Sequence, residues 1–531
     1  MNKMSLNRQK AILISVFLLI AFLFVTYLLL ILQINFQQND DLYYYSTVKS
    51  FLNGNFNLPD KMAPTFYVQG FLGGAFSAIF GVEHLPVLTL IVSVLCLVLF
   101  FSIIRANFKQ PVILSFAISL LLFFNPLFQY SILGFMTENY LLLFVLFSLF
   151  YYLQYANYSR KTDLILCSVY WIIGFFVKQV ILVLPLAYLT HSYIRKDKNG
   201  FITQAFLFFS TLFFYLNYFP HTVEMNEKGL RLSYLLNFNY SYAVFYGILL
   251  YLTAFLWPLM IPVIFSAVTA KKKKTILLLG NSIILYIILN HKYHPMSVSW
   301  GEFPFFENVF ERTGFLPRQI NGTKYIFRAS FDLYRYWEIF SKIILAGYIS
   351  AVFFTGRVRR LISSVHFYVI TFFIALMIVT VIFFDRYILM IIPSTALLLF
   401  ELSGESDFYK SFTLLRFLKN KILPFFLGLF ILFLAYFSYF LSNDYVRGLN
   451  YVWKKSQELV GQGVSPSKIY ANLAWNLTND SKIISSDYVF TYDSEKVKSN
   501  ELEDYSLLET HEVKYFLNPF IKPSIYLYKR N

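Results

Sequence analysis

Long apolar stretches, each bounded by a short polar segment, recur along most of this sequence. Their positions predict about 13 membrane-spanning helices, at 11–34, 86–104, 111–128, 139–156, 163–177, 179–194, 201–219, 241–268, 275–290, 338–356, 365–384, 387–400 and 422–441. Several stretches run for about 20 residues without a charge, which is long enough to cross a bilayer. The first stretch is longer than the apolar region of a signal peptide and lacks a small-residue cleavage site, so we expect it to remain as a helix.

Basic residues select the orientation of these helices. The basic clusters of the short loops all fall on one side, and they are Arg105 and Lys109; Arg160 and Lys161; Arg195, Lys196 and Lys198; 271–274; Arg357, Arg359 and Arg360; and Lys410, Arg416, Lys419 and Lys421. Short loops rich in Lys and Arg stay in the cytoplasm. We therefore expect a cytoplasmic N-terminus in the cytoplasmic (inner or plasma) membrane.

The stretch 66–82 is apolar as well, but it is rich in glycine. Counting it as a span would place every later basic cluster outside, so we expect a re-entrant or interfacial segment. The outer side then receives the longer loops, above all a first outer loop at 35–85 and a long outer loop at 291–337.

An odd number of spans places the C-terminus outside the cytoplasm. Residues 442–531 are polar and predict a small α/β domain, with a helix at 444–459 and strand-like segments at 482–493 and 524–528. The fold class that we expect is an all-α polytopic membrane module at 1–441, followed by this extracytoplasmic domain.

Composition agrees with a membrane protein and narrows the function. The chain is 57% hydrophobic and only 14% charged, whereas soluble domains are usually near 25% charged. Its net charge of +16 does not predict a nucleic-acid partner, because the basic residues lie mostly in the short loops. Cys96 and Cys167 lie inside apolar runs, so a disulfide framework or thiolate metal site is not expected. There is no phosphate-binding glycine loop of the ATPase type.

Two adjacent carboxylates follow the first apolar stretch, in the segment Asn39-Asp40-Asp41-Leu42. Close to a bilayer, mutual repulsion and partial desolvation raise the pKa of at least one such group, which makes it a candidate base or cation ligand. The alternative is a solvated loop start, or the N-cap of a helix that begins at Leu42. Spacing alone does not decide between the two interpretations.

A third acid, Glu138, lies between two long apolar stretches that carry no other charge. An acid at the mouth of a helix bundle usually faces a cavity or a partner; the alternative is a helix N-terminal charge that interacts favourably with the helix dipole. Lys178 lies in apolar surroundings on the same outer side, where an anionic partner would offset the cost of its burial. Arg386 is a further anion-binding candidate, with a local pair to Asp385 as the alternative.

Three histidines, His221, His291 and His294, lie in outer loops. The spacing of the last two can suit a metal ion, but no third ligand is evident. Whether a divalent cation binds near the acidic pair is not decided by the sequence.

These residues occur in an order that resembles the GT-C superfamily of membrane glycosyltransferases, which includes the lipid A aminoarabinose transferases and the protein O-mannosyltransferases. Asp40-Asp41 resembles the acidic pair of its first outer loop. Glu138 resembles a further acid of that superfamily, which follows in the next outer loop. Lys178 is similar to a lysine found before the sixth span of many members. Arg386-Tyr387 is similar to a late Arg-Tyr segment. The pair here is Asp-Asp, where many relatives have Asp-Glu.

The resemblance implies transfer of a sugar from a polyprenyl-phosphate carrier to an acceptor (lipid, glycan or protein) on the outer face, with inversion at the anomeric carbon. Asp40 is then the expected base, and Asp41 or Glu138 orients the acceptor or holds a cation. The residues expected to bind the donor are Lys178, Arg386, Tyr387 and His221. The implied partners are this lipid-linked sugar donor and membrane lipids; the acceptor stays open.

Two other functions compete with this one. A polysaccharide polymerase or ligase would use basic residues for lipid phosphates and a large late outer loop, for which 291–337 is a candidate. A lipid-oligosaccharide flippase predicts charged residues in the middle of spans and often two similar halves, and neither is found in the sequence.

Overall fold

The computed structural model describes residues 3–38, 40–59, 62–108, 111–219, 230–268, 272–292, 331–380, 384–403, 423–491, 504–513 and 524–531. Its first part contains the helices α1 (Lys3–Ile31), α2 (Asp41–Leu52), α3 (Tyr67–Phe80), η1 (Val82–His84), α4 (Leu85–Phe108), α5 (Val112–Phe123), α6 (Pro126–Ile132), α7 (Thr137–Tyr158), α8 (Lys161–Phe175), η2 (Gln179–Leu182), α9 (Val183–Ile194) and α10 (Lys198–Tyr218). The second part contains α12 (Ser233–Leu236), α13 (Phe238–Val268), α14 (Lys272–Lys292), α15 (Phe331–Phe354), α16 (Val358–Ser363), α17 (Val365–Val379), η3 (Asp385–Ile391), α18 (Ile392–Ser403) and α21 (Leu423–Gly461).

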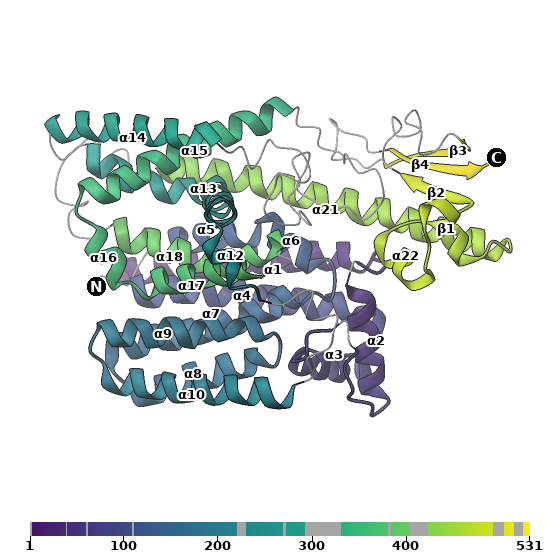
Figure 1. Cartoon of the computed structure of the whole chain (residues 1–531), viewed down its shortest axis with the longest axis horizontal. Coiled ribbons are helices and arrows are strands. Elements are labelled where there is room, and N and C mark those ends of the chain that lie inside the picture. The colour runs from purple at the N-terminus through teal and green to yellow at the C-terminus, as the bar shows by residue number, and fades with distance from the viewer. Residues whose placement is uncertain are drawn as a thin grey trace.

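Most long helices run side by side in one bundle (Figure 1). Among the described residues, eight helices are long and apolar enough to cross a membrane, and a ninth is added if the bent pair α5 and α6 forms one broken span. Four further apolar helices are shorter, namely Val68–Phe80, Gln179–Ile194, Ile276–His291 and Val365–Val379. The chain is therefore mostly helical with eight or nine helices able to cross a membrane, and the number 13 stays a prediction.

The bend between α5 and α6 measures 69° and has a local cause. The side chain of Asn125 accepts a hydrogen bond from the backbone N–H of Leu127 at 3.0 Å, which starts a new helix. Pro126 occupies the first position of that helix, where its missing N–H costs nothing. The break leaves α6 and the start of α7 at the same end of the bundle as α2 and α3 (Figure 1).

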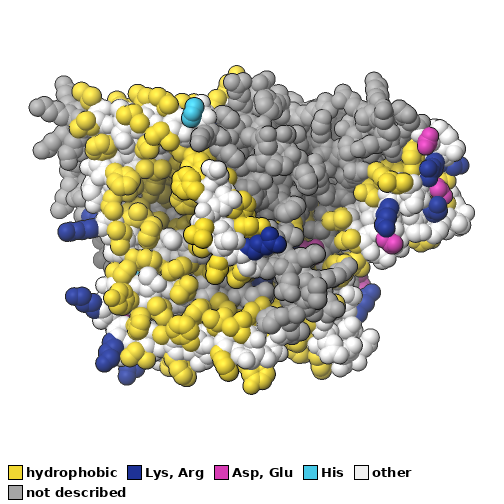
Figure 2. Space-filling model, viewed as in Figure 1, with side chains coloured by type: hydrophobic (Ala, Val, Ile, Leu, Met, Phe, Trp, Pro, Cys, Tyr) yellow, Lys and Arg dark blue, Asp and Glu magenta, His cyan; other side chains and the backbone are white. Residues whose placement is uncertain are grey.

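Apolar side chains cover much of the bundle face that Figure 2 shows. Large apolar residues such as Phe17, Phe206 and Ile276 are exposed on α1, α10 and α14. A face of this kind is costly in water and suits the apolar interior of a bilayer. Lys and Arg side chains line the edge of the bundle near the N-terminus, and the C-terminus lies at the opposite end (Figures 1 and 2).

A small sheet follows α21. The later elements are η5 (Pro466–Lys468), β1 (Ile469–Tyr470), α22 (Leu473–Asn479), η6 (Ile483–Ser485), β2 (Tyr488–Thr491), β3 (Tyr505–Glu512) and β4 (Ser524–Arg530). The strand order is β1-β2-β4-β3, with β1 and β2 parallel and the other two pairs antiparallel. The expected strand-like segments at 482–493 and 524–528 therefore contain β2 and most of β4.

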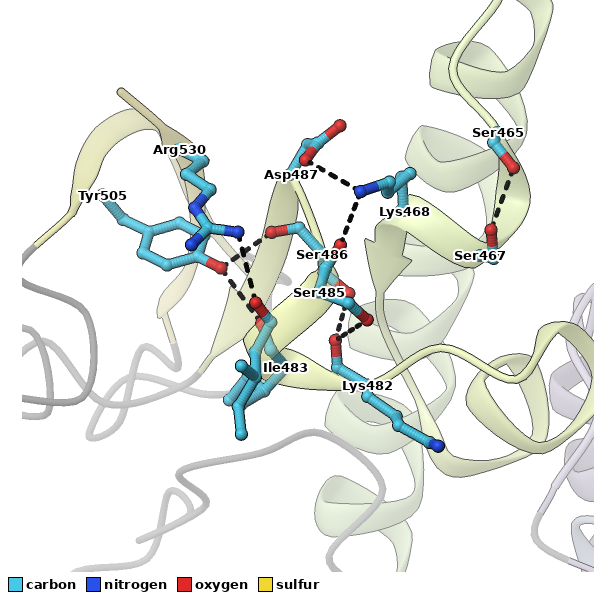
Figure 3. A network of polar contacts seen from close by, with 11 residues as sticks. Ser465, Ser467, Lys468, Lys482, Ile483, Ser485, Ser486, Asp487, Tyr505 and Arg530 are labelled. Carbon is cyan, nitrogen blue, oxygen red and sulfur yellow. Dashed lines mark hydrogen bonds and ion pairs between the residues drawn. The ribbon is translucent and has the colours of Figure 1, made fainter.

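Helix α21 joins the bundle to this sheet without a break. It is 39 residues long, so the expected domain boundary at 441/442 lies inside a continuous helix. We call 444–531 the C-terminal unit. Polar contacts hold its loops together (Figure 3): the Tyr505 hydroxyl donates to the carbonyls of Ile483 and Ser486. Lys468 lies 3.7 Å from Asp487.

Candidate active site

Asp40 occupies the N-cap position of α2, but its side chain makes no capping hydrogen bond. Its Oδ2 lies instead 2.7 Å from Nη2 of Arg386 and accepts a hydrogen bond from it. The partner is far away in sequence and comes from η3. Asp40 is thus at the helix start that one interpretation of the sequence expected, while its carboxylate serves a long-range ion pair.

The neighbouring Asp41 points into the protein and is nearly inaccessible to solvent. Its carboxylate accepts hydrogen bonds from the backbone N–H of Gln38 at 3.3 Å and of Phe135 at 3.0 Å. Burial raises the pKa of Asp41 well above its ordinary value, while these two backbone hydrogen bonds oppose the rise. The two aspartates therefore differ: Asp41 fixes the α2 start against the turn before α7, and Asp40 remains partly exposed.

Gly134 makes the close approach to Asp41 feasible. A Cβ atom at this position would lie 2.6 Å from Asp41 Oδ2 and would also meet Gln38 Oε1. A larger residue would have to displace the carboxylate of Asp41 and the side chain of Gln38. The glycine therefore allows the buried carboxylate of Asp41 to lie close to the backbone of the α6–α7 turn.

Glu138 lies in the first turn of α7 and is buried. Its Oε1 is 3.1 Å from Nε of Arg386, yet neither carboxylate oxygen accepts a hydrogen bond of good geometry from the described residues. The same holds for Nε and Nη1 of Arg386 as donors. Buried groups are rarely left in this state unless a ligand, water or ion completes them. The position of Glu138 in the first turn of α7 also fits the helix-dipole interpretation. That interpretation does not explain why Arg386 lies next to Glu138.

Lys178 lies where α8 has ended, and its backbone is extended. Its Nζ is 3.9 Å from Glu138 Oε1 and 4.4 Å from the centre of the Tyr387 ring. Attraction to the ring face adds to the ion pair in holding the ammonium group. Within a membrane, backbone that is not helical is tolerated where other parts of the protein or a cavity surround it. The segments around η2 and η3 pack against the helix bundle in this way.

The first outer loop is attached directly to the turn that carries Lys178. The carbonyl of Phe176 accepts hydrogen bonds from the backbone N–H groups of Tyr67 and Val68, both at 2.9 Å. These donors belong to the first turn of α3 and have no partner within the helix. Thr65 donates to Gln179 Oε1 at 3.3 Å. The apolar segment after the acidic pair thus helps to place Lys178.

The structure brings together five of the seven residues that the sequence singled out, Asp40, Glu138, Lys178, Arg386 and Tyr387. We call these five the outer charge cluster, after the side of the membrane on which the sequence predicts them. Asp41 borders the cluster from its buried position. His221 lies outside the described residues, as do His294 and most of the loop 291–337. Within the described ranges, no group of three His, Cys, Asp or Glu side chains is placed to hold a metal ion.

Sequence reasoning missed several supporting residues. Tyr44, one turn into α2, stacks on Phe66 with 4.9 Å between ring centroids, and it interacts electrostatically with Asp40, Glu138 and Arg386. Gly134 could have been noticed as a glycine next to the second acid. Nothing in the sequence marks the Phe176 carbonyl, because any residue type supplies a carbonyl.

The outer charge cluster is balanced and dense. Asp40 and Glu138 face two cations, Arg386 and Lys178. Such an arrangement can bind an anion through the cations and remove a proton through the more exposed carboxylate. In comparisons with known protein families, curated proteins and solved structures, no match to this chain is found.

Proposed function

We propose that this chain is a membrane glycosyltransferase of the GT-C type, which transfers a sugar from a polyprenyl-phosphate carrier to an acceptor at the outer face of the cytoplasmic membrane. One observation carries the proposal: Arg386 contacts Asp40 at 2.7 Å and Glu138 at 3.1 Å, while Lys178 approaches Glu138 from a fourth segment. A lipid-linked donor presents a phosphate close to the membrane, and this cluster offers two cations that would bind it.

The cations account for donor binding. A phosphate next to Arg386 and Lys178 would take over hydrogen-bond donors that the two carboxylates now occupy or leave unused. Guanidinium groups match phosphate oxygens with two parallel hydrogen bonds, whereas an ammonium acts as a point charge. Tyr387 holds the lysine in place through its ring. Binding of the phosphate would then release Asp40 from Arg386.

The released carboxylate accounts for the reaction. Asp40 takes the proton of the acceptor hydroxyl, and the acceptor oxygen forms a bond to the anomeric carbon. The bond between that carbon and the phosphate oxygen breaks, and its electron pair stays on the phosphate, where Arg386 and Lys178 stabilise the charge. Attack opposite to the leaving phosphate inverts the anomeric configuration. Asp40 suits the role of base because its side chain is 32% exposed, against 2% for Glu138.

The remaining residues support this geometry. Asp41 positions the start of α2 through its bonds to backbone N–H groups, and Glu138 holds both cations near each other. A divalent cation bound by the carboxylates would be compatible with the same reaction. The 13-span topology, with a cytoplasmic N-terminus and an extracytoplasmic C-terminus, belongs to the proposal. The termini at opposite ends of the bundle support it (Figure 1).

The test is sugar transfer by the purified full-length chain in liposomes, with radiolabelled hexose and pentose carried on polyprenyl phosphate. A membrane extract supplies acceptors, and release of polyprenyl phosphate is measured as well. We expect Asp40→Asn to abolish transfer, because an amide cannot take the proton. Loss of a general base costs about 10²–10⁴-fold. Thermal melting in detergent shows that the variant is folded.

Asp487→Asn is the matched control. It makes the same change on a half-exposed aspartate of the C-terminal unit, whose partner is Lys468, and we expect unchanged transfer. If Asp40→Asn retained full transfer, Asp40 would not be the base. If wild type released no polyprenyl phosphate from any donor of the panel, the proposed activity itself would be wrong.

A further inference from the structure

The segment that leads from α1 to the acidic pair is held by α21. Asn450 donates from Nδ2 to the carbonyl of Gln33 at 2.6 Å, and its Oδ1 accepts from the backbone N–H of Asn35 at 2.9 Å. One side chain thus occupies two backbone groups that follow the end of a helix. Each of these contacts spans more than 400 residues of sequence.

A second asparagine holds the same segment closer to Asp40. Asn472 is buried and donates from Nδ2 to the carbonyl of Gln37 at 3.0 Å. Its other atom, Oδ1, accepts from the backbone N–H of Trp475 at 3.1 Å and so caps α22. Between these two contacts, the ring of Phe36 meets Tyr445 edge-on with 5.6 Å between centroids.

Both asparagines belong to one packed body. Trp453 of α21 meets Trp475 of α22 edge-on, with ring centroids 5.2 Å apart and an interplanar angle of 90°. The Trp475 indole N–H donates to the carbonyl of Pro466 at 3.3 Å. The polar contacts of Figure 3 hold the adjoining loops. Movement of the C-terminal unit would therefore carry Asn450 and Asn472 together.

We propose that the C-terminal unit is a positioning device for the acidic pair, with Asn450 and Asn472 as its positioning residues. The proposal rests on the function proposed above, because it assigns the unit a part in that reaction. Only Gln38 and Asn39 separate Gln37 from Asp40 in sequence. A shift of Gln37 therefore displaces the base, whereas Lys178 and Arg386 lie on other segments. Reacting groups must be held closely, since a misplacement of about 1 Å can lower a rate by about 10²-fold.

Single-atom substitutions separate this role from the stability of the unit. Asn472→Asp keeps the oxygen that caps α22 and removes the donor to Gln37. Asn450→Asp keeps the acceptor for Asn35 and removes the donor to Gln33. Asn476→Asp is the matched control, because its Nδ2 donates to the carbonyl of Ala471 inside the C-terminal unit and does not reach the segment.

The first measurement is hydrogen exchange of the full-length protein, followed by mass spectrometry of peptides that cover 33–45. We expect Asn472→Asp and Asn450→Asp to raise the exchange rate of these peptides by about tenfold, because the segment opens locally more often when one of its hydrogen bonds is lost. Asn476→Asp should leave these peptides unchanged. If exchange at 33–45 stays at the wild-type rate in both test variants, or rises equally in the control, the proposed tie is overturned.

The second measurement is sugar transfer by the same proteins. We expect kcat to fall by about tenfold while KM for the lipid-linked donor does not rise, because the cations that bind its phosphate are untouched. Faster exchange with unchanged kcat would overturn the positioning role. The exchange result stands on its own, so a wild-type chain that transfers no sugar would reject the proposed function and leave the tie between the C-terminal unit and the acidic pair supported.

Discussion

Two of the groups of buried charges in the described helices are built in different ways. The outer charge cluster draws Asp40, Glu138, Lys178 and Arg386 from four separate segments. The second group lies between α14 and α15, where Lys342 pairs with Glu338 one turn earlier on the same helix and donates to Asn290 at 3.3 Å. Both groups are nearly inaccessible to solvent, apart from Asp40 and part of Lys178.

The difference lies in how the charges are brought together. The pair on α15 is local, and its lysine also fastens two neighbouring helices, which is a structural use of a buried charge. In the outer cluster, the charges come from four segments, and two nitrogens of Arg386 and both oxygens of Glu138 make no hydrogen bond of good geometry with the described residues. Incomplete satisfaction combined with long-range assembly is what a binding site for a charged substrate requires. The comparison predicts that mutations separate the groups into one that controls transfer and one that controls stability.

Arg386→Gln should have the largest effect. It removes the partner of both Asp40 and Glu138, and breaking a buried ion pair from one side costs about 3–5 kcal/mol. Transfer should fall by at least ~10³-fold, because the main phosphate ligand is lost as well. Thermal melting and the transfer assay measure the two effects. Arg386→Lys keeps the charge but loses the guanidinium that contacts both carboxylates, so its transfer rate should lie between those of wild type and Arg386→Gln. If Arg386→Gln transferred sugar as fast as wild type, Arg386 would not bind the donor phosphate.

Lys178→Met should lower transfer by about 10²-fold with a smaller loss of stability. Its contact with Glu138 is long, at 3.9 Å, so Glu138 keeps Arg386 as its closer partner. The lost cation should raise KM for the donor. A matched change on the other group, Lys342→Met, should leave KM unaltered. A rise in KM with Lys342→Met and none with Lys178→Met would reverse the comparison.

Glu338→Gln and Lys342→Met should each destabilise the chain by about 3 kcal/mol, whereas the double change should recover most of the loss. Replacing one charge removes the ion-pair partner of the other, while replacing both removes the pair as a whole. Transfer should stay within about twofold of wild type throughout, once folded protein is counted. Thermal melting of the four proteins completes the cycle. Additive losses in the double variant would show that the two charges do not stabilise each other.

An ion pair nearer the surface should show the smallest effect on stability. Lys455 on α21 lies 2.7 Å from Glu509 on β3, and solvent screening limits such pairs to about 0.2–1 kcal/mol. The hydrogen bond from Lys455 lowers the pKa of Glu509 below its ordinary value of 4.5. The stabilisation is therefore present above pH 4.5 and is lost as the pH falls through the lowered pKa. Glu509→Gln should remove this acid sensitivity, which thermal melting at pH 3 to 6 measures; an unchanged pH dependence would contradict it.

Hydropathy located the helices well because apolar length is a local property. Each stretch expected to span overlaps a described helix. The boundary at 441/442 was less informative, since polarity changes there while nothing stops a helix. Helix α21 ends only at Gly461, shortly before Gly463 with its φ of +93°.

The site was harder to predict than the helices. The sequence singled out Asp40, Glu138, Lys178 and Arg386, which the structure brings together, but it could not tell the two adjacent aspartates apart. Their difference arises from the Phe135 backbone, 94 residues away from Asp41. The ion pair on α15 also escaped notice, although its spacing of four residues is visible in the sequence. The apolar length of the stretch at 338–356 predicts a membrane span and gives no indication of a buried ion pair.

The central claim is that the outer charge cluster binds the phosphate of a polyprenyl carrier, and photocrosslinking tests it most directly. A polyprenyl phosphate with a photoreactive group next to the phosphate is added to the full-length protein in liposomes, and the labelled peptides are identified by mass spectrometry. The account predicts labelling at 175–179 and 384–388, reduced by Arg386→Gln and unaffected by Lys342→Met. The account would be contradicted if Arg386→Gln left the labelling unchanged, or if α15 were labelled more strongly than these two segments.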